Sequence, residues 1–326
     1  MISSKKILFP FLTFCISFSL LSAIQLNIES PMLLLERFYR NFGWIEVLVF
    51  SLFGSFLVFK MIDETKIAYW RRISWLIFGF FFFIQLILGL SGFDKFLMTG
   101  DLHLPIPAII IGGAIFKLKI SFMVILLIAN IIISGPAWCS QLCYFGAFDN
   151  WAASKNKYSK FTIKNIWAYK HVILLIFVLG TILLRFFDVS IDTAIIFGSV
   201  FGTIGLLILL ILSLQKGKMI HCVAYCPIGT IVSYLKFINP IRMYIDQSCT
   251  NCMKCTTSCN YIALEKENIE RKVIGVTCTY CGDCLATCKS NSIKYKAFGI
   301  KSENVRYIYL TITVSLYVVF LAVARI

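Results

Sequence analysis

The chain has 326 residues, of which 59% are hydrophobic and only 14% are charged, and its mean hydropathy is +0.84. Soluble domains carry about a quarter charged residues, so this composition excludes an ordinary soluble protein and predicts that most of the chain lies in a lipid bilayer. The formal net charge of +15 does not indicate a nucleic-acid partner, because the lysines and arginines lie in short loops between apolar segments, as on the cytoplasmic side of membrane proteins.

The chain opens with apolar segments separated by short loops. Residues 1–26 begin with a basic stretch and continue as an apolar run of about 20 residues, which predicts an uncleaved first helix, with a cleaved signal peptide as the alternative. Residues 29–43 are amphipathic and are expected at the outer surface. Spans are predicted at 44–62 and 73–90, and the basic loop at 60–72 marks the cytoplasmic side.

Residues 91–116 interrupt this pattern. Their apolar part, 105–116, is too short to cross a bilayer, and its two prolines and the Gly112–Gly113 pair argue against a regular helix. We expect a re-entrant or interfacial element on the outer side, forming one wall of a quinone pocket with His103 and Asp101 as candidate proton-handling groups. The alternative is a surface loop that dips into the headgroups.

Further spans are predicted at 119–138, 171–187, 194–215 and, after a long polar segment, 307–324. The basic loops at 155–170 and 216–218 place the ends of these spans in the cytoplasm. These loops could dock an acidic soluble redox protein, or serve only to fix the topology.

A C-x3-C motif follows two of the spans. Cys139 and Cys143 form the first motif, and Cys222 and Cys226 form the second, so the sequence predicts a duplicated unit of two spans and a motif. A spacing of four places both thiols on one face of a helical turn. Two facing turns could present four thiols to a metal or cluster, form redox-active pairs, or pack as small buried residues. The spacing does not choose among these roles.

Two cysteine runs near the C-terminus carry the strongest signal in the chain. Each has the spacing C-x2-C-x2-C-x3-C, which is the ligand pattern of bacterial proteins with two [4Fe-4S] clusters. Because the fourth cysteine of each run ligates the other cluster, two ligand sets are predicted. The first set is Cys249, Cys252, Cys255 and Cys288, and the second is Cys278, Cys281, Cys284 and Cys259.

Other cofactors fit the sequence less well. A zinc site stops at four ligands, and a disulfide framework needs an oxidising compartment, whereas the predicted topology places both runs in the cytoplasm. Haem is not indicated, because His103 is expected outside while His171 and His221 are expected at the cytoplasmic face. No nucleotide-binding glycine motif is present, and no outer loop is long enough for a flavin domain.

These elements combine into one predicted architecture. The fold class is a membrane all-α helical bundle of six to seven transmembrane helices with an inserted cytoplasmic, bacterial-type 2[4Fe-4S] ferredoxin-like α+β module. The expected divisions are an N-terminal span with its outer segment, the bundle with both C-x3-C motifs, the cluster module and a C-terminal helix, at 1–43, 44–245, 246–298 and 299–326.

The motifs CSQLC and CVAYCP together with the two cysteine runs resemble the NapH/MauN/NosR family of membrane-bound polyferredoxin-like proteins, over roughly residues 44–298. In that family proline typically follows each C-x3-C motif; here Pro227 matches, whereas Tyr144 takes the other position. The final apolar segment lies beyond the family pattern.

The resemblance implies an electron-transfer protein of the bacterial cytoplasmic (inner) membrane. Such a protein links the quinone pool to an extracytoplasmic respiratory reductase or dehydrogenase system, as a quinol dehydrogenase component. Its expected partners are the bilayer, quinone and protein redox carriers, and its expected cofactors are two [4Fe-4S] clusters. The alternative is a maturation factor that supplies electrons for the assembly of a partner metalloenzyme.

Overall fold

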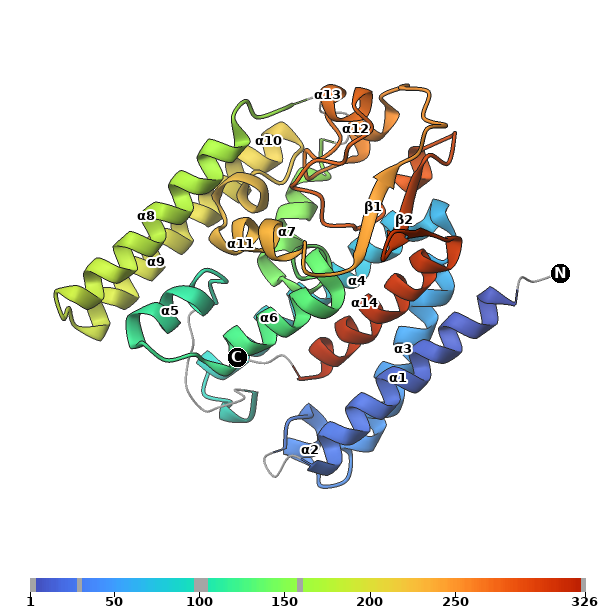
Figure 1. Cartoon of the computed structure of the whole chain (residues 1–326). Helices are drawn as coiled ribbons and strands as arrows, with labels where there is room; N and C mark the ends of the chain where they lie inside the picture. Colours follow the sequence, from blue (N-terminus) through green and yellow to red (C-terminus); the bar gives the residue numbers. More distant parts are fainter. Residues whose placement is uncertain (1–3, 28–30, 97–104, 157–160, 324–326) are drawn as a thin grey trace.

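The computed structural model describes residues 4–27, 31–96, 105–156 and 161–323, and helices dominate it (Figure 1). Within these residues, seven helical segments are long and apolar enough to cross a membrane: Lys5–Asn27, Gly43–Met61, Glu64–Leu90, Phe122–Leu142, Ile166–Phe186, Ile191–Lys216 and Glu303–Val323. The predicted fold class is therefore confirmed, and each predicted span has its helix.

The long helices are α1 (Lys5–Asn27), α3 (Gly43–Met61), α4 (Glu64–Leu90), α6 (Phe122–Ser134), α8 (Ile166–Phe186), α9 (Ile191–Leu207) and α14 (Glu303–Val323). The shorter ones are α2 (Leu34–Phe38), α5 (Ile109–Lys117), α7 (Tyr144–Ala153), α10 (Leu214–Lys216), α11 (Pro227–Leu235), α12 (Lys254–Ser258) and α13 (Lys266–Glu270). Short 3-10 turns lie at Asp94–Phe96 (η1), Gly135–Ala137 (η2) and Leu285–Thr287 (η6), and π-helical turns at Trp138–Leu142 (η3), Ile208–Ser213 (η4) and His221–Tyr225 (η5).

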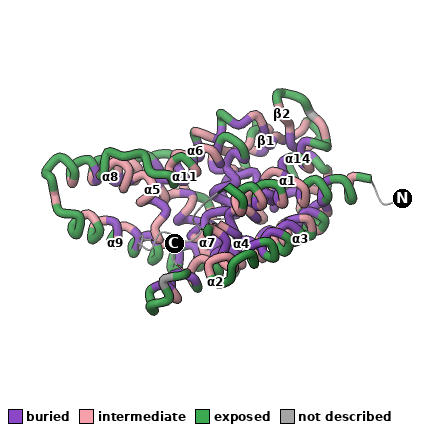
Figure 2. The backbone as a smooth tube through the Cα atoms, turned by 90° about the horizontal axis from the view of Figure 1, so that it is seen from below, coloured by how far each residue is buried: buried purple, intermediate pink, exposed green. Residues whose placement is uncertain are grey.

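The helices form two unequal groups. Helices α1, α3, α4 and α6 surround α14, whereas α8 and α9 stand to one side as a hairpin (Figure 1). Figure 2 shows the hairpin largely exposed and the centre of the molecule buried. Leu175 and Ile196 are more than half exposed, as expected for side chains that face lipid in place of protein.

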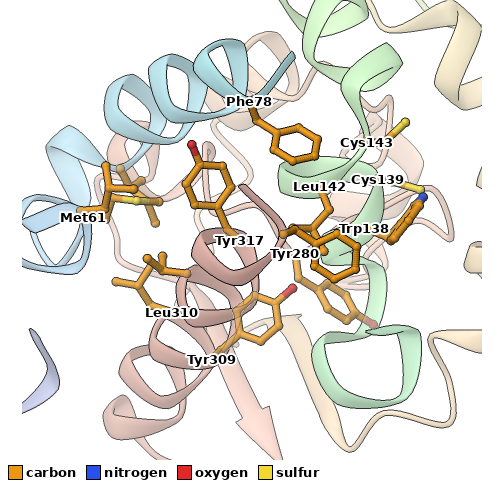
Figure 3. Packing of buried hydrophobic residues seen from close by; sticks show 14 of the residues in the cluster. Met61, Phe78, Trp138, Cys139, Leu142, Cys143, Tyr280, Tyr309, Leu310 and Tyr317 are labelled. Atoms are coloured by element: carbon orange, nitrogen blue, oxygen red, sulfur yellow. The ribbon is translucent and has the colours of Figure 1, made fainter. Parts of the chain in front are cut away.

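Helix α14 is the best buried of the long helices. It packs against α1, α3, α6 and β2 (Ile293–Ala297). The hydroxyl of Tyr317 donates to the Ser74 carbonyl of α4 (2.6 Å), and Arg306 at its first turn pairs with Glu64 at 3.0 Å. Figure 3 shows Tyr317 among Met61, Phe78 and Leu142 in the bundle core. The last predicted span is therefore a central part of the bundle.

A small antiparallel sheet frames the cysteine-rich module at one end of the bundle. Strand β1 (Ile241–Ile245) comes before the first cysteine run and β2 after the second, with Ile241 opposite Ala297 and Ile245 opposite Ile293. Strand β3 (Ile300–Lys301) extends the sheet beyond β2. The pairing brings the two ends of the module together and leads directly into α14.

Two local predictions were wrong. The basic stretch at 60–72 is mostly helical, because α4 begins at Glu64, where the Asp63 carboxylate accepts the Thr65 N–H at 3.0 Å. The stretch at 105–116 contains a regular helix, α5, because both prolines lie before its first turn and Gly112 lets it approach Phe177 of α8 closely. Whether α5 borders a quinone pocket stays a prediction.

Candidate iron–sulfur centres

The first predicted ligand set lines one hollow, and we call it group I: Cys249, Cys252, Cys255 and Cys288. Three of these thiols come from the loop and short helix after β1, and Cys288 arrives from the far end of the second run. Apolar side chains close the rest of the wall, among them Ile245, Ile269 and Ile293. A hollow bounded by four thiols and aliphatic groups fits a [4Fe-4S] cluster.

The second predicted set, group II, consists of Cys259, Cys278, Cys281 and Cys284. Burial raises the pKa of the Cys284 thiol, and the neighbouring Cys281, Cys259 and Cys278 raise it further. Burial also raises the pKa of Cys278 to about 11, and the neighbouring Cys259 thiol raises it as well. Cys259 thus lies close to thiols of the second run, although it ends the first run and also neighbours Cys255 there.

The two cysteine runs have the same backbone geometry. Left-handed residues occur at matching places: Asn251 (φ 54°) and Met253 (φ 58°) in the first run, Tyr280 (φ 55°) and Gly282 (φ 82°) in the second. Successive N–H groups in such loops turn inward and make a cradle for an anionic group. The repetition of this geometry is an independent sign that both loops are built for the same ligand.

Among the described side chains, no three histidine, cysteine, aspartate or glutamate groups converge closely enough to hold a single metal ion. The group I thiols instead surround a hollow, which is the arrangement that a multi-iron cluster requires.

The remaining motif cysteines form group III: Cys139, Cys143, Cys222 and Cys226. Each C-x3-C motif adopts a π-helical turn, closed by the hydrogen bonds Cys143 N–H to Trp138 O (2.9 Å) and Cys226 N–H to His221 O (2.8 Å). The prediction of an ordinary helical turn was therefore wrong. Such wider turns occur often at functional sites. In Figure 3, Cys139 and Cys143 lie on the side of their turn that faces away from Tyr317.

The two turns continue identically into short helices. Cys143 and Cys226 are extended residues that precede α7 and α11, so Tyr144 and Pro227 occupy the same first helical position. Proline is favoured there because that position needs no N–H donor. Tyr144 is tolerated and stacks on Phe82, with ring centroids 3.8 Å apart. Both motifs therefore have the same local backbone, with tyrosine after one and proline after the other.

A glycine follows each motif at the same distance. A side chain at Gly229 would place its Cβ 2.5 Å from the Cys222 carbonyl oxygen, and one at Gly146 would lie 3.4 Å from the Cys139 carbonyl oxygen. At Gly229 the helix packs closely on its own motif, whereas the closest neighbour at Gly146 is Trp75 Cζ2 at 2.5 Å. The matching positions of the two glycines support the predicted duplication, although their tightest contacts differ.

The four group III thiols are electrostatic neighbours. Burial raises the pKa of Cys222, and Asp149, Cys143, Cys226 and Cys139 raise it further. Burial raises the pKa of Cys143 to about 12 even though N–H groups of the following helix donate toward its sulfur. Concentrated negative charge in a buried place is unstable unless a cation or metal compensates it.

Groups II and III share a cavity. It is lined by Cys139 and Cys222 from group III, Cys278 from group II, and by Lys170, Lys236 and Tyr261. The Tyr261 hydroxyl donates to the Cys139 carbonyl (2.8 Å), and Ser140 Oγ donates to the Thr279 carbonyl (3.4 Å). The module is therefore joined to the motif turns by direct hydrogen bonds.

A buried ion pair fixes the same junction. Arg71 of α4 donates to both carboxylate oxygens of Asp283, at 2.7 and 2.6 Å, and to the Ser140 carbonyl at 2.7 Å. Arg72 approaches the same carboxylate at 3.2 Å. Burial disfavours the charged Asp283, but the two arginines outweigh it and hold the pKa of this carboxyl below its ordinary value.

Sequence reasoning missed several of these residues. Asp149 is fully buried and accepts the Cys222 N–H at 2.9 Å, and burial raises its pKa to about 6.

Lys170 and Lys218 were counted with the basic loops, yet each is only 2% exposed, so neither can dock a partner. Charge in a loop predicts topology but carries no information on burial. His103 and Asp101 lie outside the described residues.

The sequence profile of a family described as "4Fe-4S binding domain" matches residues 118–160 and 199–240. These two segments contain the two halves of group III with the spans that lead into them. The match supports the duplicated unit, covers less than half of the chain and does not extend over the two cysteine runs.

A curated relative, an uncharacterized protein of Methanocaldococcus jannaschii, is 23% identical over 205 residues, covering 59% of this chain and 76% of its own length. No solved structure matches the chain significantly. With the seven long apolar helices, these findings describe a multi-pass membrane protein that carries a 4Fe-4S binding domain.

Proposed function

We propose that the chain is a membrane-bound electron-transfer protein in which groups I and II each bind one [4Fe-4S] cluster. The observation that carries the proposal is the exchange of the fourth ligand, since Cys288 lines the hollow of the first run and Cys259 neighbours the thiols of the second. The exchange makes the two sites adjacent, and the module that holds them lies at one end of the helix bundle (Figure 1).

The two groups offer different routes of access. Cys252 of group I is exposed, whereas Cys284 of group II is buried and precedes the turn η6, which packs against α4. A soluble redox partner would therefore approach group I, and a carrier in the bilayer would exchange electrons on the group II side. When bound, two clusters supply two one-electron carriers, which matches the two electrons lost when a quinol becomes a quinone; the two protons would leave the quinol separately.

The bilayer carrier in this proposal is quinone. The chain would act as the quinol-oxidising component of an extracytoplasmic respiratory reductase or dehydrogenase system, in the bacterial inner membrane with its module in the cytoplasm. The resemblance of the cysteine motifs to NapH/MauN/NosR proteins and the basic loops support this assignment. His103 and Asp101 stay the proposed proton-handling groups.

Group III would provide a further thiolate site for an iron–sulfur cluster. Its support is the presentation of four buried or half-buried thiols by two equivalent turns, and the match of both turns to a 4Fe-4S binding family. Its place beside the cavity shared with group II would put it between the module and the bundle.

Electron exchange with a quinol analogue tests the main proposal. The full chain, purified without oxygen in detergent and loaded with clusters, should show reduction of its clusters by the quinol or reoxidation by the quinone, followed by visible absorbance and electron paramagnetic resonance. Cys15→Ser is the matched control, because Cys15 lies in α1 away from all three groups and its loss should leave exchange unchanged.

Clusters that form but exchange electrons with neither quinol nor quinone would contradict the quinone-linked role. The alternative, a maturation factor, would then be tested by the metal content of a partner enzyme in cells that lack this chain.

A further inference from the structure

Two buried lysines bracket the segment that carries the second C-x3-C turn. Lys218 lies just before the turn and Lys236 just after α11, and each is only 2% exposed. Lysine is almost never fully buried without a partner, because removing an ammonium group from water is costly. Among the ion pairs between described residues, none includes either lysine.

Both ammonium groups point to the backbone of group II. Lys218 Nζ donates to the carbonyls of Thr256 (3.0 Å) and Cys259 (2.8 Å). Lys236 Nζ donates to the carbonyls of Cys278 (2.9 Å) and Val276. Cys259 and Cys278 are both group II cysteines, so each lysine is attached to a different ligand of the same group.

Backbone carbonyls satisfy the hydrogen-bond donors but leave the positive charge uncompensated. Burial lowers the pKa of both lysines, and neighbouring thiols oppose that shift: Cys259 at Lys218, and Cys278 with a smaller contribution from Cys139 of group III at Lys236. The nearest buried carboxylate at group II, Asp283, is already paired with Arg71 and Arg72. The two lysines are thus available as counter-charges for an anionic group held by these thiols.

Group I lacks an equivalent arrangement among the described residues. The lysines next to its cysteines in the sequence, Lys254 and Lys289, are exposed, and water and salt screen their charge. The two groups therefore differ in the cations that surround them, although their loops have the same shape.

We propose that Lys218 and Lys236 are positioning residues that raise the reduction potential of the cluster in group II. The inference rests on the proposed binding of clusters by groups I and II, and does not depend on quinone as the carrier. Reduction adds negative charge in a buried place, which burial alone would disfavour. Two fixed ammonium groups favour the reduced form and offset that effect.

The test is a redox titration with chemical mediators, monitored by electron paramagnetic resonance on the full chain. Lys218→Gln and Lys236→Gln keep a donor but remove the charge. In each variant, the reduced-to-oxidised ratio of the group II cluster at the wild-type midpoint should fall about tenfold, equivalent to about 59 mV for one electron. The group II signal is assigned in a Cys252→Ser background, which removes a ligand of group I.

Two matched variants complete the design. Lys289→Gln, at an exposed lysine beside a group I ligand, should leave both potentials unchanged, and Lys236→Arg should keep the wild-type potential of group II. If the lysines only tie loops together, the Gln variants would lose cluster content while the remaining clusters kept their potential, and the inference would be overturned. Wild-type protein without two clusters would overturn the proposed function and this inference together.

Discussion

Cys259 and Cys288 end the two cysteine runs, and each lies with the thiols of the other run. Both follow a short helical turn and have nearly the same backbone angles, φ −84° and ψ 103° for Cys259, φ −85° and ψ 91° for Cys288. This geometry sends each fourth thiol away from its own loop. Each cluster would therefore depend on cysteines from both runs, which are far apart in the sequence.

Double substitutions can distinguish exchanged from unexchanged ligands. Cys249→Ser with Cys288→Ser removes two thiols of group I, so one cluster and about four irons should be lost. Cys249→Ser with Cys259→Ser takes one thiol from each group, so both clusters should be impaired and the iron loss should be larger. Iron and acid-labile sulfide per chain provide the measurement. Equal losses in the two double variants would refute the exchanged assignment.

The same assay addresses group III. Cys139→Ser with Cys226→Ser should lower iron while the signals of groups I and II persist. Unchanged metal content and unchanged electron exchange would reduce these four cysteines to packing residues.

At the scale of single residues, the motif cysteines could be predicted from the sequence, but the charged residues that lie next to them could not. Ligand spacing is a local property, so the runs at 249–259 and 278–288 could be recognised from sequence alone. Lys218, Lys236 and Asp149 depend on which distant segments meet, and nothing next to them in the sequence signals burial. A charged residue between apolar segments looks the same whether it faces water or a thiolate.

At the scale of elements, α4 is the link between the membrane helices and the module. Sequence analysis predicted a charged loop where the first turns of α4 lie, because Arg71 and Arg72 follow other charged residues. In the structure, Arg71 is fully buried against Asp283, which precedes a group II cysteine. The geometry of α4 positions the Arg71 guanidinium, and the carboxylate of Asp283, which is distant in the sequence, compensates its charge and makes its burial possible.

Removing one partner of this pair should destabilise the module. Asp283→Asn leaves the Arg71 charge buried without its counter-ion, at a cost of about 3–5 kcal/mol. We expect the apparent melting temperature, followed by the visible absorbance of the clusters, to fall by about 5–10 °C.

The exposed pair Lys266–Glu270 provides the control, with 77% and 50% of the two side chains exposed. Glu270→Gln should change the melting temperature by less than about 1 °C, because exposed pairs contribute little. A similar change in both variants would show that the buried pair is not what holds the module on α4.

The C-x3-C elements were predicted in position but not in shape. Duplication could be inferred because Cys-x3-Cys recurs after a span and is followed by a glycine three residues on, Gly146 in one copy and Gly229 in the other. The π-helical shape of the turns could not be predicted from the sequence, because a spacing of four residues fits an ordinary helical turn equally well.

For the whole molecule, hydropathy located all seven spans, although the third helix begins at Glu64, well before the predicted start at residue 73. Hydropathy did not predict how deeply each helix is buried within the protein. The last segment was expected to lie beyond the family pattern, yet 72% of its apolar window is buried, compared with 17% for α8 and 22% for the segment that begins with α9. Hydropathy measures how apolar a helix is. It does not say whether lipid or protein surrounds it.

The position of α14 also fixes the relative orientation of the termini. Lys5 of α1 pairs with Glu303 of α14 at 3.5 Å, and the rings of Phe9 and Tyr307 are 5.2 Å apart. The first turns of both helices therefore lie at the same end of the bundle, next to β2 and the module. Seven crossings would place the module and the start of α1 on one side of the membrane, and the end of α14 on the other.

Reporter fusions test this arrangement. A fluorescent protein that matures only in the cytoplasm should be active when fused before α1 or inserted between α7 and α8, and inactive after α14. Alkaline phosphatase, which is active only outside the cytoplasm, should show the reverse, and should also be active when inserted at Asp188 between α8 and α9. The two insertion sites are matched controls, because they flank one helix, α8, and must report opposite sides. Cytoplasmic fluorescence from the C-terminal fusion would mean that α14 does not cross, and the module would then lie against a six-span bundle.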